Sequence, residues 1–239
     1  MEYLIQGETL TGIADAIRGK TGGSGPILAA QMAGKIGEIS VGGDTLMERL
    51  KNTMTNYVNN EITSVISYGL SYQTALTSVS MPNCTSLDAG AFYGCSALAE
   101  LYLPALVSIQ NNCFRNCYAL TQFITGSAFD SRIDNSAFEG CSNLTKIDLY
   151  HVNRLGISTY AFACANLTTL IIRNTDIVAK ANVSSIFGGS DTAMNQGAGY
   201  IYVPASMVDS YKEATNWTVF ADQIRAIEDY PDITGGVTQ

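Results

Sequence analysis

The sequence repeats a short phrase. Residues 91–98 are AFYGCSAL, and the phrase returns as CFRNCYAL at 113–120 and AFEGCSNL at 137–144. A fourth copy, AFACANL at 161–167, is one residue shorter. The four phenylalanines stand 22, 24 and 24 residues apart. A repeat of this period predicts a solenoid, in which each coil is one supersecondary unit and neighbouring coils bury a shared core.

Each copy leads into an apolar pattern. A leucine three residues after the cysteine is followed in most copies by apolar residues at +3 and +5, and another apolar residue precedes the phenylalanine by five. Alternate strand residues share a face, so this spacing predicts a turn that enters a short strand. An opening coil fills the same slots upstream, with Leu70 in the phenylalanine position and Gln73 in the cysteine position. Residues 201–204 fit a closing strand, and residues 176–199 indicate a degraded repeat with a loop.

These residues resemble the BspA-type leucine-rich repeat, whose pattern is approximately a-F-x-x-C-x-x-L-x-x-I-x-L-P. The resemblance covers residues 62–204. With the recurrence of the repeat in register, we expect an α/β solenoid, a right-handed stack of about six coils with a parallel β-sheet on one face and helical caps at both ends. Families of this type include bacterial cell-surface adhesins and antigens and prophage-encoded proteins. The resemblance therefore implies recognition or display, and it brings no catalytic residues.

The remaining chain divides around the repeats. We expect a helical docking segment over 1–43, a capping helix over 44–61, the solenoid over 62–204, a helical cap over 205–230 and a flexible tail over 231–239. Asp44 is a suitable N-cap, and apolar residues at helical spacing follow it. A proline is tolerated at the start of a helix, which suits Pro204. Trp217 is expected to anchor the second cap rather than to bind a ligand.

Residues 10–22 are similar to the I-A-D-A-I-R-x-K-T-G segment near the start of tail-associated proteins in prophages of Gram-positive bacteria. Residues 199–227 are similar to the terminal caps of prophage repeat proteins. These likenesses imply that residues 1–43 dock the chain to a virion or to copies of itself. The segment contains two short apolar-striped helices, expected over 10–18 and 26–39, with glycine-rich hinges after each.

Charge and hydropathy exclude several classes of partner. The net charge is −8 and the sequence pI is about 4.5, so nucleic acid and anionic membrane surfaces are disfavoured. We find neither a secretory signal in residues 1–6 nor an apolar run long enough for membrane insertion. The expected locations are a phage virion or a bacterial cell surface.

Cysteines and the single histidine give no catalytic or metal centre. Cys95, Cys117, Cys141 and Cys164 occupy one slot of successive coils, which predicts a ladder of free, buried thiols that pack as small hydrophobes. There is no C-x-x-C pair for zinc, and His151 is expected to be a solvated surface residue. We therefore predict no enzyme, no cofactor and no metal.

The outward face of the repeat strands is the candidate binding surface. Its residues are Ser80, Glu100, Tyr102, Gln122, Ile124, Lys146, Asp148, Ile171, Arg173 and Tyr202. Exposed tyrosines and aliphatics can contact a protein or a surface glycan, although parallel strands favour such residues in any case. The sequence thus indicates a non-enzymatic binding protein, either a phage tail or baseplate accessory protein or a cell-surface adhesin of the BspA type. An enzyme is the weakest alternative.

Overall fold

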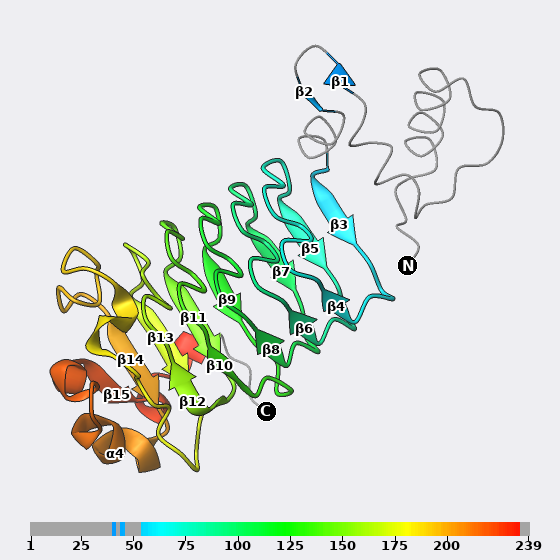
Figure 1. Ribbon diagram of the computed structural model, residues 1–239. Coiled ribbons are helices and arrows are strands. Elements are labelled where there is room, and N and C mark those ends of the chain that lie inside the picture. Colours follow the sequence, from blue (N-terminus) through cyan, green and yellow to red (C-terminus); the bar gives the residue numbers. More distant parts are fainter. Residues whose placement is uncertain (1–39, 42–43, 46–53, 235–239) are drawn as a thin grey trace. The chain divides into compact units, whose positions relative to one another are not determined.

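The computed structural model describes residues 40–41, 44–45 and 54–234 (Figure 1). The chain divides into two compact units, Met1–Met54 and Thr55–Gln239. In the first unit, β1 (Ser40–Val41) pairs with β2 (Asp44–Thr45) in antiparallel fashion. The helices expected over 10–18 and 26–39 lie outside the described residues.

The second unit is a stack of coils whose strands pair in parallel along what we call the main sheet face. A three-stranded sheet contains β3 (Asn56–Val58), β5 (Ser78–Ser80) and β7 (Glu100–Tyr102). A five-stranded sheet contains β9 (Gln122–Ile124), β11 (Lys146–Leu149), β13 (Thr169–Ile172), β14 (Tyr200–Val203) and β15 (Ile224–Ala226). The predicted solenoid is thereby confirmed.

The register of the main sheet face follows the sequence repeat. Ser80 pairs with Tyr102, Asp148 pairs with both Ile124 and Ile171, and Ile171 pairs with Tyr202. The in-register alignment of these positions, expected from the sequence, is therefore confirmed within each sheet.

A second row of strands forms another side of the coil. One sheet contains β4 (Ser64–Val65), β6 (Ser86–Leu87) and β8 (Ser108–Ile109), and β10 (Ser131–Ile133) pairs with β12 (Val152–Ile157). The expectation of a parallel sheet on one face alone was too simple. The apolar residue five before each phenylalanine, such as Leu87 or Ile109, is buried in this row, and the serine before each of these two is half-buried.

Tight turns close the third side of each coil. Residues two before each phenylalanine have positive φ, and so do those two after it except at Phe162, as at Gly90, Gly94, Asn112 and Asn116. Glycine and asparagine tolerate this conformation best. The turns bond to the next coil, since the backbone N–H of Phe92 donates to the Cys113 carbonyl at 2.9 Å.

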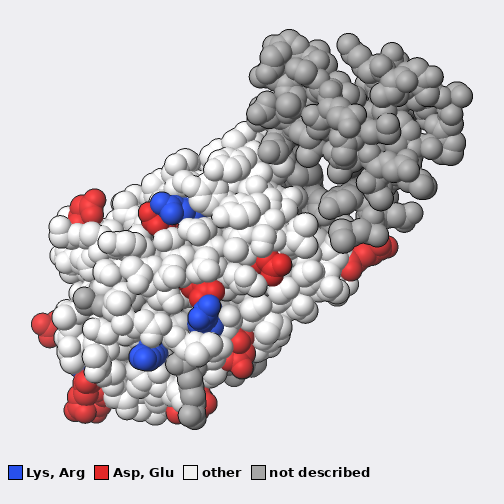
Figure 2. All heavy atoms as spheres, in the orientation of Figure 1, with Lys and Arg blue, Asp and Glu red and all other residues white. Residues whose placement is uncertain are grey.

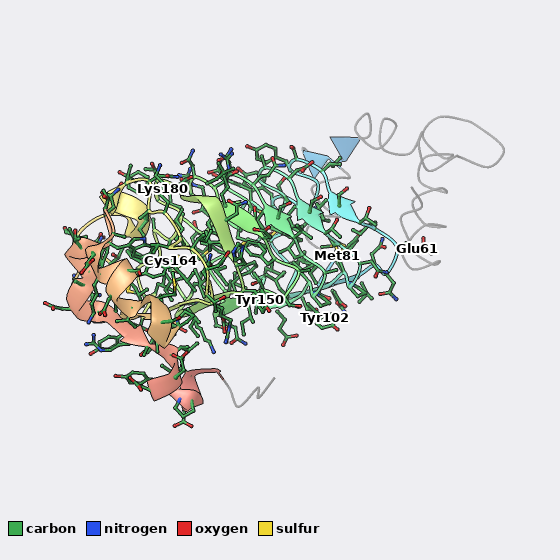
Figure 3. All side chains as sticks on the ribbon, turned by 90° about the horizontal axis from the view of Figure 1, so that it is seen from below. Glu61, Met81, Tyr102, Tyr150, Cys164 and Lys180 are labelled. Atoms are coloured by element: carbon green, nitrogen blue, oxygen red, sulfur yellow. The ribbon has the colours of Figure 1, made fainter. Side chains whose placement is uncertain are left out.

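A stack of phenylalanine rings fills the interior. Phe92 and Phe114 lie with ring centroids 5.4 Å apart, Phe114 and Phe138 5.3 Å apart, and Phe138 and Phe162 6.2 Å apart. All four are fully buried. Figure 3 shows Met81 and Cys164 inside the coils, whereas Tyr102 and Tyr150 lie along an outer edge. The repeated phenylalanine is therefore the continuous core of the solenoid.

All six cysteines are free and buried, as predicted for the four of the ladder. Each ladder thiol reaches a main-chain carbonyl of the preceding coil, because Cys117 Sγ donates to Phe92 O at 3.2 Å and Cys141 Sγ donates to Phe114 O at 3.0 Å. The same bond joins Cys95 to Leu70 in the opening coil. The cysteines thus contribute hydrogen bonds between coils as well as apolar packing.

The prediction of a capping helix over residues 44–61 is wrong at both ends of that range, where the structure has strands. Residues 44–45 form β2 and residues 56–58 form β3, while residues 46–53 lie outside the description. Tyr57 pairs with Val79, so the repeat strands begin before residue 62. Residues 56–58 alternate with the period of two that a strand requires. This pattern is only three residues long, and the apolar residues around it are also spaced as in a helix.

The C-terminal region also differs from expectation. Instead of one helical cap over 205–230, it forms η2 (Ala205–Met207), α4 (Val208–Glu213), η3 (Thr218–Gln223), the sheet strand β15 and η4 (Ile227–Asp229). The predicted flexible tail contains η5 (Pro231–Thr234), and η1 (Ser184–Phe187) lies in the irregular coil. Trp217 anchors this region as predicted, because it is fully buried and its indole N–H donates to Ala179 O at 2.6 Å.

Candidate recognition surface

The ten residues predicted as a binding face fall into an uncovered part and a covered part. Tyr102 and Ile124 are 59% and 53% exposed, and Glu100 and Gln122 beside them are exposed as well. Val58 of β3 is 55% exposed and pairs with the half-buried Ser80. We call the set Val58, Ser80, Glu100, Tyr102, Gln122 and Ile124 the open patch.

The covered part corrects the prediction. Asp148, Ile171 and Tyr202 are only 5%, 0% and 6% exposed, although the register places them on the outward column. Outward orientation in a strand does not give exposure when another segment lies over the sheet. These three residues are therefore unavailable to a partner.

The chain's own C-terminal segment, residues 227–234, provides that cover. The Tyr230 ring meets Tyr202 edge to face with centroids 5.3 Å apart, and Lys146 Nζ donates to the Ile233 carbonyl at 2.6 Å. Figure 1 shows the red C-terminal segment in front of the main sheet face near β13 and β11. In Figure 3 it lies on the same side as Tyr150 and Tyr102.

Asp148 and Arg173 form an ion pair under this cover. Arg173 Nε donates to Asp148 Oδ1 at 2.8 Å and its Nη2 donates to Oδ2 at 2.7 Å, a bidentate arrangement. The hydrogen bond with Asp148 raises the pKa of Arg173 above its ordinary value. Two predicted binding residues are thus engaged with each other and tie adjacent coils together.

The open patch carries little charge. Figure 2 shows a mostly uncharged face with isolated acidic and basic groups, and Glu100 is the only charged side chain among the six residues of the patch. A tyrosine and two aliphatic side chains with few charges match the composition of the centre of a protein interface. The patch is suited to contact rather than to chemistry.

His151 and the buried cysteines are the remaining side chains considered for chemistry. His151 Nδ1 lies 2.8 Å from Asp130 Oδ1, and its Nε2 lies 3.4 Å from Asp176 Oδ1. Burial raises the pKa of the Cys95 thiol to about 12, so the thiolate is disfavoured in the folded protein. Across residues 54–234, no three His, Cys, Asp or Glu side chains are placed to hold a metal ion.

Sequence reasoning missed Val58 and the C-terminal cover. A signal for β3 was present, because Asn56-Tyr57-Val58 stands 22 residues before Ser78-Val79-Ser80, one repeat period upstream. Residues 227–234 carry no repeat pattern, so nothing local to them indicated that they cross the sheet.

Short coils with stacked parallel strands and a repeated leucine, phenylalanine and cysteine define a leucine-rich-repeat protein. Six copies of the BspA type leucine rich repeat region match residues 63–186, just over half of the 239 residues, and the chain belongs to this family. Comparison with curated proteins gave no match. Within the part of the chain described, no helix is long and apolar enough to cross a bilayer.

Proposed function

We propose that the chain is a non-enzymatic binding protein that holds a partner protein on the open patch. The observation that carries this proposal is the contrast within one sheet face. Over β11, β13 and β14 the outward column is buried by the chain's own C-terminal segment, whereas Val58, Tyr102 and Ile124 on β3, β7 and β9 have no such cover from the described residues.

The covered half favours a polypeptide partner over a glycan. There the sheet face holds a stretch of chain with two short 3-10 helices, through an aromatic contact at Tyr202 and a main-chain carbonyl contact at Lys146. The open patch offers side chains of similar kind, with Tyr102 in the aromatic role and Gln122 in register with Lys146. A polypeptide could use the same types of contact there.

Two matched tyrosine substitutions test the proposal. Biolayer interferometry of the full chain against purified cell-surface and extracellular proteins would identify a partner. Tyr102→Glu is expected to weaken that binding at least about tenfold, because it places a charge in the centre of the interface. Tyr118→Glu is the control, since Tyr118 is 47% exposed and lies outside the open patch. Equal binding by both variants would contradict the proposal.

The biological setting follows from two separate observations. Membership of the BspA-type family supports a bacterial cell-surface adhesin. The likeness of residues 10–22 to prophage tail-associated proteins supports a phage tail or baseplate accessory protein that docks through residues 1–43, and these residues lie outside the description apart from a two-residue strand. Gene neighbourhood separates the two, because adjacent tail and lysis genes would establish a virion component.

A further inference from the structure

A pocket of about 450 Å³ lies among the turns and loops of the coils. Three successive coils line it, and the residues that matter most are Glu139, Ser142, Tyr160, Gly188, Asp191 and Thr192. None of its lining residues belongs to a strand of the main sheet face. The volume falls within the range of small-molecule sites, roughly 300 to 1,000 Å³.

One wall of the pocket comes from an enlarged coil. Thr169 pairs with Lys146, 23 residues earlier, but with Tyr200, 31 residues later. The extra residues form the irregular loop that contains Gly188, Asp191 and Thr192. Insertions into solenoid coils map to loops on one face, which is often a binding face.

The loop is held in place by hydrogen bonds. Asn195 Nδ2 donates to Gly189 O at 2.7 Å, and the backbone N–H of Ala193 donates to Ala165 O of the preceding coil at 2.9 Å. Gly188 has φ +86°, and a Cβ there would lie 2.9 Å from the Ala163 Cβ. The wall is therefore fixed before any ligand binds, which lowers the entropic cost of binding.

Tyr160 stands in the pocket in a backbone conformation that tyrosine disfavours. Its φ is +56°, and the corresponding turn position in the three preceding coils is Gly90, Asn112 and Ser136. The side chain is nevertheless 45% exposed, so burial in the core does not account for an aromatic residue here. The left-handed turn is a regular feature of the coils and Tyr68 shares it, so what distinguishes Tyr160 is its place in the pocket lining.

The pocket is rich in acceptors and lacks positive charge. Glu139 and Asp191 provide carboxylates, Ser142 and Thr192 provide hydroxyls, and none of the described lining residues is lysine or arginine. Glu139 is held by Arg115, whose Nη2 lies 2.9 Å from its Oε1. Such a site disfavours anions and favours a ligand that donates several hydrogen bonds and has a flat C–H surface for the Tyr160 ring.

We propose that this pocket binds an uncharged saccharide, with the Tyr160 ring against a pyranose face and the Glu139 and Asp191 carboxylates accepting its hydroxyl groups. The site is separate from the open patch, and the proposal is independent of any protein partner there.

A matched pair of tyrosine variants tests it. Isothermal titration calorimetry of the full chain would use chitotriose, maltotriose and cellotriose as uncharged probes and trigalacturonic acid as the anionic probe. At least one uncharged probe is expected to bind. Tyr160→Asn is expected to weaken it about tenfold, because asparagine tolerates the turn but cannot stack. Tyr68→Asn is the control, since Tyr68 has φ +57° at the same turn position, is 54% exposed and lies outside the pocket.

Four results would overturn the proposal: no binding of any uncharged probe, unchanged binding by Tyr160→Asn, equal weakening by Tyr68→Asn, or tighter binding of trigalacturonic acid. Thermal unfolding checks that the Tyr160→Asn variant is folded. Asp191→Asn provides a second variant, which removes an exposed carboxylate of the lining and is also expected to weaken the uncharged probe.

Discussion

At the scale of single residues, phenylalanine and cysteine act together across coils. Each ladder thiol donates to the main-chain carbonyl of the core residue one coil earlier, as Cys164 does to Phe138 at 3.1 Å. Cysteine is small enough for this slot and supplies a weak donor, which alanine and valine lack. The repeated Phe and Cys in the sequence therefore correspond to one hydrogen bond that repeats from coil to coil.

Phe138→Ala should lower the free energy of unfolding by about 3 to 5 kcal/mol, because it removes a fully buried ring and leaves a cavity. The ring lies between Phe114 and Phe162 and also meets Phe123 at 4.8 Å. Urea unfolding measures the loss. Leu155→Ala is the control, because Leu155 is 61% exposed and should change stability by less than about 0.5 kcal/mol. Similar losses for both variants would contradict the stacked core.

Stability should fall as the pH rises above about 9. Burial raises the pKa of Cys95 to about 12, and it raises the pKa values of Cys117 and Cys164 well above the ordinary value. In the unfolded chain these thiols ionise near their ordinary pKa, so the unfolded state then binds fewer protons than the folded state and is favoured. Between its ordinary pKa and its raised pKa, each such thiol lowers the free energy of unfolding by about 1.4 kcal/mol per pH unit. Urea unfolding at pH 8 and pH 10 measures it, and equal stability at the two values would contradict buried neutral thiols.

At the scale of elements, the repeat pattern predicted the strands of the main sheet face, β5, β7, β9, β11, β13 and β14, and their register, because one residue in two faces a shared core. It did not predict the second row of strands. It could not predict β15, since Ile224–Ala226 has no phenylalanine and cysteine phrase before it and joins the sheet through pairing with Ile201 and its neighbours. The prediction that Asp148, Ile171 and Tyr202 are exposed was wrong for a similar reason. Their cover comes from a segment without a repeat, through contacts that no local pattern encodes.

Removal of residues 231–239 should uncover Lys146. Its amine donates to the Ile233 carbonyl at 2.6 Å, so it is occupied while the segment is in place. Acylation by an N-hydroxysuccinimide ester, followed by peptide mass spectrometry, should show faster modification of Lys146 in the truncated chain. The exposed Lys180 serves as the internal control and should react equally in both. An unchanged rate at Lys146 would mean that the segment does not hold it in solution.

At the scale of the whole molecule, the solenoid carries its two candidate binding sites on different parts of the coils. The open patch lies on the main sheet face, and the Tyr160 pocket is lined by turns and by an enlarged coil. Solenoids suit this use because each coil depends only on its neighbours, so one coil can gain a loop without disturbing distant ones.

Residues 1–40 should be dispensable for the stability of the repeats. The chain divides at residue 54, and the second unit contains the whole stacked core. Deletion of residues 1–40 is therefore expected to leave thermal unfolding of the repeat unit unchanged while abolishing oligomerisation or incorporation into a larger assembly. Circular dichroism and light scattering measure the two effects. Loss of the folded repeat unit would show that the segment belongs to the core, and the docking role would then fail.

The most direct test of recognition through the open patch asks which side of the solenoid touches a bound protein. A photoreactive benzoylphenylalanine would replace Ile124 on β9 or, in a matched chain, Leu155 on β12, two aliphatic residues that are 53% and 61% exposed on different rows of strands. Irradiation of each chain with its partner protein should give a cross-linked product from position 124 and none from position 155. A cross-link from position 155 alone would contradict recognition through the open patch.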